Sequence, residues 1–158
     1  MLDQLGRYAL FGDLSEEDLS LAAPYFSEVQ VPAGEVLFRQ NQTADLLYLV
    51  INGQVALRYK PYDGPEIGLT HVPAGGAVGW STVTGGPVYT ATAIASLPCE
   101  FLTVRGTDLR LLLAEHPVSG ERLLKRLAMA VSPRWEGAYR QVMSMIARTM
   151  AQQQNEQS

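Results

Sequence analysis

Cysteine and histidine are scarce in this chain of 158 residues, which contains one cysteine and two histidines. The single cysteine, Cys99, excludes an internal disulfide and a zinc or iron–sulfur site made of several thiolates from one chain. The histidines, His71 and His116, lie in no cluster with carboxylates at metal-ligand spacing. We therefore expect no metal site, and we expect Cys99 to be a small buried side chain.

Long apolar runs are also missing. No segment reaches the length of a membrane-spanning helix, and the early leucines Leu2, Leu5 and Leu10 are interrupted by polar residues, so no secretory leader is indicated. The expected location is the cytoplasm, without a membrane partner. An apolar content of 47% is sufficient for one packed domain of this length.

Charge is absent from a long central stretch, since no Asp, Glu, Lys or Arg occurs between Glu66 and Glu100. Elsewhere the charge is uneven, with ten acidic and four basic residues in 1–66, and eight basic and four acidic residues in 105–148. The basic excess is accompanied by no dense cluster and no nucleic-acid recognition module. This favours a solvated helix face over nucleic-acid binding.

Catalytic signatures are lacking as well. Ser81 follows Gly79-Trp80 but has no second glycine of a nucleophile elbow, and no Ser–His–Asp or Cys–His arrangement is indicated. We expect no catalytic residue and no enzyme.

The chain does contain a helix signal followed by a series of short strand signals. Ser15 followed by Asp18 has the form of a helix N-cap with an acid three residues on, and the helix should end before Pro24. Asn52-Gly53 is the strongest local hairpin signal. The pattern predicts strands around VQV, EVLF, DLLYLVI, QVALRYK, EIGLTHV, YTATAIA and CEFLTV.

The last third of the chain predicts helices. One is expected to be capped by Thr107, a second to begin at Pro117, and a third to begin at about Trp135. The sequence thus predicts a single domain, mainly β with flanking α. A helix and an antiparallel β-roll or jelly roll should occupy about residues 10–104, followed by C-terminal helices over about 107–152.

This order of elements resembles the cyclic nucleotide-binding domain, the sensor domain of the catabolite-activator and FNR-like regulators and of kinase regulatory subunits. The segment VPAGEVLFRQNQTADLLYLVINGQVAL, residues 31–57, is similar to the opening strands of the family, with Gly34 and Gly53 at its turns. Gly75 and Gly79 then follow the spacing that leads into the family's phosphate-binding cassette.

The resemblance implies that the uncharged stretch is this cassette, in which a short helix and the loop before it point backbone N–H groups at a cyclic phosphate. In the family, a glutamate after the glycine accepts a hydrogen bond from the ribose 2′-OH, and an arginine near the end of the cassette neutralises the phosphate. Here Trp80 takes the glutamate's place, and the arginine's place falls on Tyr89 or Val88, depending on the register. The predicted ligand-binding residues are Gly79, Trp80, Ser81, Thr82, Val88, Tyr89, Thr90 and Thr92.

The missing arginine leaves two hypotheses open. A charge-assisted hydrogen bond contributes about 1.5–3 kcal/mol, so its loss should weaken cyclic nucleotide binding roughly tenfold to a hundredfold. In the first hypothesis the chain is a stand-alone regulatory module that senses a nucleotide or a less charged small ligand, with Trp80 stacking on its ring. In the second, Trp80 and Tyr89 fill the cavity of a ligand-free domain that binds a protein partner or dimerises through its helices.

The last predicted helix carries an apolar stripe spaced by three and four residues. The family's helix at this position pairs with its twin, so we expect a homodimer interface at Trp135, Tyr139, Val142 and Ile146. Transcription factors of the family continue into a helix-turn-helix domain, whereas this sequence stops in QQQNEQS. We therefore expect no DNA binding, a regulatory effect on a partner protein, and no cofactor other than a cyclic nucleotide or nucleotide-like ligand.

Overall fold

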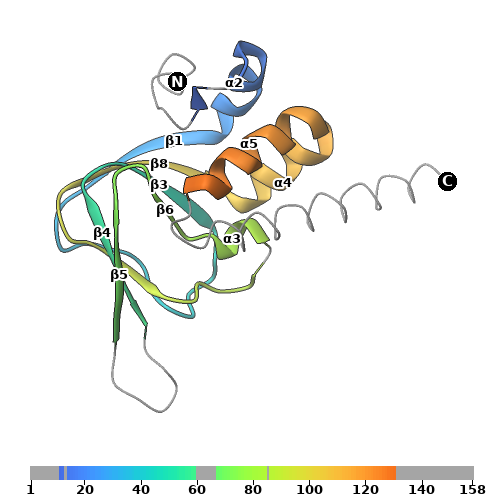
Figure 1. Cartoon of the computed structure of the whole chain (residues 1–158). Helices are drawn as coiled ribbons and strands as arrows, with labels where there is room; N and C mark the ends of the chain where they lie inside the picture. The colour runs from blue at the N-terminus through green and yellow to red at the C-terminus, as the bar shows by residue number, and fades with distance from the viewer. Residues whose placement is uncertain (1–10, 13, 60–66, 85, 131–158) are drawn as a thin grey trace.

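Two antiparallel sheets of four strands form the centre of the molecule (Figure 1). The computed structural model describes residues 11–12, 14–59, 67–84 and 86–130. The first sheet has the strand order β1 (Phe26–Val31), β8 (Cys99–Arg105), β3 (Leu46–Asn52) and β6 (Ala77–Val78). The second has the order β2 (Val36–Phe38), β7 (Thr92–Ala95), β4 (Gln54–Tyr59) and β5 (Ile67–Pro73). The β-roll predicted from the sequence is confirmed.

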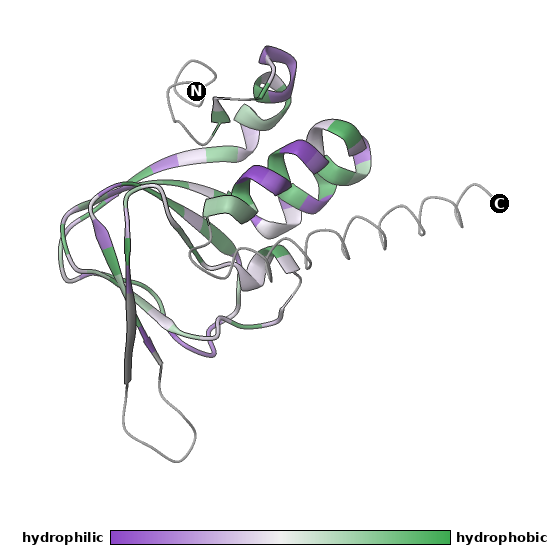
Figure 2. Cartoon of the chain, viewed as in Figure 1, coloured by the Kyte–Doolittle hydropathy of each residue, from purple (hydrophilic) through white to green (hydrophobic). Residues whose placement is uncertain are grey.

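Helices precede the roll, interrupt it and follow it (Figure 1). Before the roll lie α2 (Glu16–Ala22) and the 3-10 turn η2 (Ala23–Tyr25); within it lies α3 (Ser81–Thr84); after it lie α4 (Gly106–Glu115) and α5 (Pro117–Ala130). Hydrophilic and hydrophobic residues alternate along α5 (Figure 2), as expected of a helix with one buried face.

The first sheet separates two hydrophobic clusters, because neighbouring side chains of a strand point to opposite faces. Leu47 and Leu49 of β3 belong to the cluster shared with the helices, whereas Val50 belongs to the cluster inside the roll. Along β8, Leu102 faces the helices and Phe101 faces the interior in the same way. The helices therefore pack on the outer face of a sheet whose inner face lines the roll.

Local signals in the sequence account for several boundaries. Ser15 accepts a hydrogen bond from the Asp18 amide while Asp18 accepts one from the Ser15 amide, which is the predicted helix cap. Gly53 adopts a φ of +99° in the hairpin between β3 and β4, and α5 begins at Pro117. The predicted cap at Thr107 is wrong, since α4 already begins at Gly106 and Arg105 is the N-cap residue, without a side-chain cap.

Asp18 connects the N-terminal helix to the C-terminal one. Its side chain is 3% exposed, and its carboxylate accepts hydrogen bonds from Ser119 Oγ at 2.6 Å and Arg122 Nη1 at 3.2 Å. Burial raises the pKa of Asp18, but the hydrogen bonds from Ser119, Arg122 and Ser15 outweigh it, so the pKa lies below its ordinary value. The ionised form of Asp18 therefore stabilises the packing of α2 on α5.

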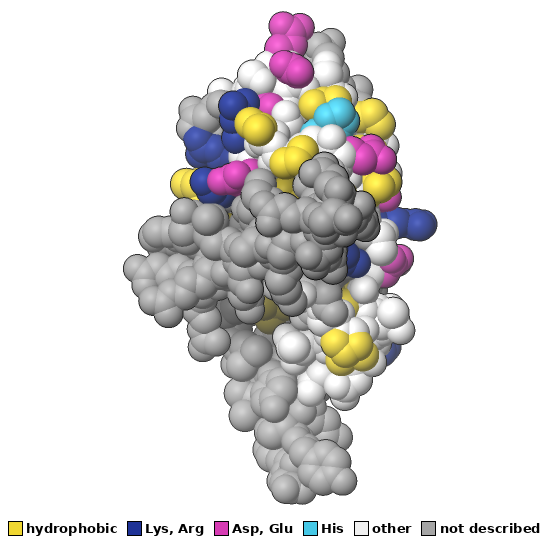
Figure 3. Space-filling model, turned by 90° about the vertical axis from the view of Figure 1, so that its right-hand side faces the viewer, with side chains coloured by type: hydrophobic (Ala, Val, Ile, Leu, Met, Phe, Trp, Pro, Cys, Tyr) yellow, Lys and Arg dark blue, Asp and Glu magenta, His cyan; other side chains and the backbone are white. Residues whose placement is uncertain are grey.

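The basic residues of α5 are partly compensated at the surface. Lys125 forms an ion pair with Glu121 at 2.8 Å, and Arg122 pairs with Asp18. Lys and Arg side chains gather on one flank of the helical end in Figure 3, with acidic side chains beside them. These pairs support the interpretation of the basic excess as a solvated helix face.

The third predicted helix cannot be compared with the structure, whereas the predictions on membrane spans and on Cys99 can. The third helix from about Trp135, with its predicted interface at Tyr139, Val142 and Ile146, lies outside the described residues. Among the described residues, no helix is both long and apolar enough to cross a membrane. Cys99 is buried, as predicted.

We predict that Asp18→Asn lowers the free energy of unfolding at neutral pH by about 1–3 kcal/mol, because a buried charged hydrogen-bond partner is lost. In the native protein this contribution is complete above the ordinary aspartate pKa of 3.8 and disappears as the pH falls through the lower pKa of the folded state. Urea unfolding from pH 7 to pH 2 measures both the loss of unfolding free energy in the variant and the pH dependence of stability in the native chain. Glu17→Gln, at an exposed neighbour in α2, is the control, and an equal loss in both variants would contradict the prediction.

Candidate functional site

The entrance of the candidate site is a glycine turn that brings the chain close to β3. Gly79 follows β6 and has a φ of +90°, which favours glycine. A Cβ at this position would lie 2.7 Å from the Leu46 carbonyl oxygen and 3.2 Å from Tyr89 Cε1. The turn therefore requires glycine both for its backbone conformation and for the space available.

Helix α3 follows this turn and is anchored on its far side by α4. Arg110 Nη1 donates to the Thr82 carbonyl oxygen at 2.7 Å, and a Cβ on Gly106 would collide with Thr82. Thr82 is 3% exposed, and its hydroxyl donates to the Ala44 carbonyl oxygen at 3.4 Å. The polar groups of Thr82, one of the predicted ligand-binding residues, thus hold α3 between α4 and the loop before β3.

Tyr89 lies inside the roll at the exit of the cassette. It is 3% exposed, and its ring stacks on Phe38 with the centroids 3.7 Å apart and the planes at 15°. The Tyr89 hydroxyl donates to the Leu46 carbonyl oxygen at 2.7 Å, and accepts from the Leu46 amide at 2.8 Å and the Asp45 amide at 3.2 Å. One phenol thus satisfies three backbone groups where β3 begins.

Burial raises the pKa of Tyr89, while its hydrogen bonds to the backbone of Leu46 and Asp45 lower it and the charge of Asp45 raises it. The net shift is upward. Burial likewise raises the pKa of Tyr48, with Tyr89, Asp45 and Glu35 adding to the increase. Both phenols are therefore neutral near neutral pH, and that of Tyr89 is a donor.

The backbone around Tyr89 is paired with the loop before β3. The Tyr89 amide donates to the Gln42 carbonyl at 2.9 Å, and the Tyr89 carbonyl accepts from the Asn41 amide at 2.9 Å. The Ala44 amide donates to the Pro87 carbonyl at 3.1 Å. An isolated antiparallel bridge joins Thr43 and Val88 between them. The exit of the cassette is therefore held by backbone hydrogen bonds as well as by the phenol.

The remaining predicted residues separate into two groups. Thr92 is engaged in the fold, because its hydroxyl accepts a hydrogen bond from the Gln40 amide at 2.9 Å. Trp80 is half-buried against the cluster shared with the helices, so it does not accompany Tyr89 inside the roll. Ser81 is half-buried, Thr90 is exposed, and neither side chain hydrogen-bonds to the described part of the chain. Ser81 and Thr90 are thus the predicted site residues whose hydroxyls have no hydrogen bond to the described residues.

Arg110 is the site residue that sequence reasoning missed. It lies within an ordinary amphipathic helix, 28 positions after the residue it anchors, and no local pattern connects the two.

No group of three or more His, Cys, Asp or Glu side chains able to hold a metal ion occurs among residues 11–12, 14–59, 67–84 and 86–130.

A β-roll with a short helix between β6 and β7, covered by helices α4 and α5, defines a class of sensor domain. This chain belongs to the cyclic nucleotide-binding domain family, whose sequence model matches residues 28–116. The chain is 29% identical over 119 residues to the cyclic AMP receptor protein of Thermus thermophilus, covering 75% of this chain and 55% of that protein. The chain thus spans about half the length of that relative.

Solved structures agree with this assignment. An N-terminal domain of a transcriptional regulator from Streptomyces coelicolor A3(2) is similar with a TM-score of 0.64 and 30% identity, over 79% of this chain and 89% of that domain. A cyclic nucleotide-binding domain from Methylobacillus flagellatus has a TM-score of 0.71 and 26% identity, over 90% of this chain and 80% of that one.

We predict that Gly79→Ala destabilises the fold by more than its backbone strain alone. Positive φ costs an alanine about 1–2 kcal/mol, and the collision with the Leu46 carbonyl should add about 1–3 kcal/mol. Gly34→Ala is the matched control, because Gly34 also has a φ of +90° and a Cβ there meets nothing within 4 Å. Urea unfolding measures both variants, and equal losses would show that the close approach to β3 is not required.

We also predict that Tyr89→Phe lowers the free energy of unfolding by about 1–3 kcal/mol, because the buried polar groups of Asp45 and Leu46 lose their partner. Tyr25→Phe, at a half-buried tyrosine with no hydrogen bond to described residues, should change it by less than about 0.5 kcal/mol.

The Tyr89 variant should also differ at alkaline pH. Because the folded-state pKa of Tyr89 is raised, its protonated form contributes stability below the ordinary pKa of 10.0, and this is lost as the pH rises through the raised value. Tyr89→Phe should therefore lose less stability than the native chain above pH 10. Identical alkaline profiles would contradict the buried position of this phenol.

Proposed function

We propose that this chain is a regulatory ligand-sensing module, in which a small molecule binds at the cassette and changes the arrangement of the C-terminal helices. The supporting observation is the direct contact between α3 of the cassette and α4, the first of the helices that follow the roll. Arg110 of α4 donates to α3, and Gly106, the first residue of α4, packs closely against Thr82. A ligand that displaces α3 would therefore act on α4 directly, with no further element between them.

The chemistry of the cassette favours a ligand with less charge than a cyclic nucleotide, or one whose phosphate stays in solvent. Between Ile67 and Cys99 the chain has no Lys or Arg, and its one histidine there, His71, is exposed on β5. We propose that Tyr89 takes the place of the family's arginine, because it is the residue that faces the interior. A buried phosphate there would meet a neutral phenol and carbonyl oxygens, which is unfavourable for an anion.

Trp80, Ser81 and Thr90 are the proposed ligand contacts. The half-buried indole of Trp80 offers a surface for a base or another ring, and the hydroxyls of Ser81 and Thr90 are available for hydrogen bonds. The module has no catalytic step in this proposal. The proposed module acts in the cytoplasm on a partner protein, as a homodimer through Trp135, Tyr139, Val142 and Ile146.

A second candidate function follows from Tyr89. Its ring and hydroxyl already occupy the space between Phe38 and the start of β3. A domain filled in this way can serve as a ligand-free module that binds a protein through its helices.

A thermal-shift series on ligand-stripped protein distinguishes the two candidates. The probes are cyclic AMP, cyclic GMP, AMP, adenosine and guanosine, and a probe at a hundred times its dissociation constant should add about 2.7 kcal/mol of stability. We expect a nucleoside to give a larger shift than either cyclic nucleotide, and Ser81→Ala to reduce it, with Ser20→Ala as an exposed control. No shift with any probe would favour the ligand-free candidate.

Hydrogen exchange on the same samples tests the transmission step. The active ligand should change the protection of amides in α4 and α5, and Arg110→Ala should reduce that change while the ligand still binds. Arg105→Ala removes an exposed arginine at the start of α4 and is the control. An undiminished response in Arg110→Ala would contradict the proposed connection.

A further inference from the structure

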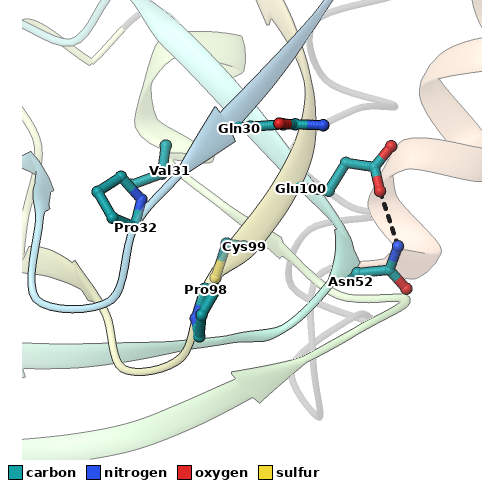
Figure 4. A pocket seen from close by; sticks show the side chains of 7 residues that line it. All are labelled: Gln30, Val31, Pro32, Asn52, Pro98, Cys99 and Glu100. Atoms are coloured by element: carbon teal, nitrogen blue, oxygen red, sulfur yellow. Dashed lines mark hydrogen bonds between the residues drawn. The ribbon is translucent and has the colours of Figure 1, made fainter.

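A pocket of about 450 Å³ lies at the end of the first sheet where β1 ends and β8 begins (Figure 4). Helix α3 packs against Gly106, the residue that follows the opposite end of β8, so the pocket and this contact lie about 20 Å apart along the seven-residue strand. Its lining residues are Gln30, Val31, Pro32, Asn52, Pro98, Cys99 and Glu100. A volume of this size is typical of sites for small ligands.

Three polar side chains lie side by side across the strands at this pocket. Gln30 of β1 and Asn52 of β3 are both register partners of Glu100 in β8. Asn52 Nδ2 donates to Glu100 Oε2 at 2.7 Å, which orients the carboxylate. Figure 4 shows the three side chains on one side of the opening and Pro32 and Pro98 on the other.

The charge of Glu100 is not compensated within the described part of the chain. Glu100 is half-buried, forms no ion pair there, and no Lys or Arg lines the pocket. An ionised carboxylate can accept about four hydrogen bonds, whereas Glu100 accepts one from Asn52. Among the described residues, the carboxylate of Glu100 therefore has acceptor capacity left for a further donor.

The walls of the pocket are held in place by contacts behind them. A Cβ on Gly53 would lie 2.8 Å from Cys99 Sγ, so the β3–β4 hairpin packs directly on the start of β8. Cys99 Sγ donates to the Leu97 carbonyl at 3.1 Å, and Ser96 Oγ donates to the Gln54 carbonyl at 3.0 Å. These contacts join the loop before β8 to the hairpin, so the pocket exists before any ligand arrives.

We propose that this pocket is a second binding site, for a small free organic cation with a planar amidinium or guanidinium group and an apolar body. The cationic group donates to Glu100, with the amide oxygens of Gln30 and Asn52 beside it, because planar nitrogen cations pair well with carboxylates. The apolar body lies against Pro32 and Pro98. The site is separate from the cassette, so it does not depend on the proposed function.

Benzamidine is the probe that tests this site, and its neutral analogue benzamide is the chemical control. Titration of the native chain, followed through the side-chain amide NMR signals of Gln30 and Asn52, should give a saturable shift with benzamidine. Glu100→Gln removes the charge while an amide oxygen can still accept from Asn52, so the fold should be retained. Glu115→Gln, at an exposed acid at the end of α4, is the matched control.

The expected result is that benzamidine binds Glu100→Gln at least about tenfold more weakly than the native chain, and that benzamide binds the native chain at least about tenfold more weakly than benzamidine. Glu115→Gln should bind benzamidine as the native chain does. Equal binding by Glu100→Gln, equal binding of benzamide, or no saturable shift at Gln30 and Asn52 would overturn the proposal. A capped Gly-Arg-Gly tripeptide that bound more tightly than benzamidine would overturn the free cation in favour of a partner's arginine.

Discussion

The hydroxyl group of Tyr89 satisfies three backbone groups of Asp45 and Leu46, at the beginning of the strand that organises the first sheet. That strand, β3, has β8 on one side and β6 on the other, and β6 leads directly into the turn at Gly79. The Leu46 carbonyl oxygen accepts a hydrogen bond from the Tyr89 hydroxyl, and the same oxygen leaves no room for a Cβ at Gly79. The entrance and the exit of the cassette therefore meet at one peptide group, and the position of α3 depends on it.

The first sheet connects the cassette to both hydrophobic clusters, because each of its faces belongs to a different one. On the inner face, Tyr89 continues into an aromatic series through Phe38, Tyr48 and Phe101. On the outer face, α3 and α4 meet through Thr82 and Arg110. A change at the cassette thus affects the interior of the roll and the helices together, as packed interiors do not deform independently of their neighbours.

The elements that the sequence predicted correctly are those with local causes. Asn52-Gly53 forms its hairpin and Ser15 caps its helix, because the residues that cause each feature lie within a few positions of it. The start of α4 was misplaced because a distant contact decides it: Gly106 begins the helix where it packs against Thr82, which no neighbour of Gly106 indicates.

The candidate site shows the same limit. Position in the sequence predicted the cassette but not the partner of each hydroxyl group, since Thr82 and Thr92 bond to backbone groups of residues far away in the chain. The hydrogen bonds of Asp18 to Ser119 and Arg122, and of Tyr89 to Leu46, are long-range in the same sense. Residue type suggests that such groups will find partners, but only the folded chain determines which partners.

The pairing of β1 with β8, in which Phe26 lies opposite Val104, has a consequence for the order in which the molecule is completed during synthesis. β1 leaves the ribosome before the other strands of the roll, and its one neighbour in the sheet, β8, is the last strand to emerge, so β1 stays unpaired until the roll is nearly complete. The partners of Asp18 in α5 follow later still. An unpaired strand is a template for aggregation. The polar side chains of Ser27, Glu28 and Gln30 make such pairing less favourable before β8 is available. Among the described elements, α2 and β1 are thus the first to be synthesised and among the last to be fully packed.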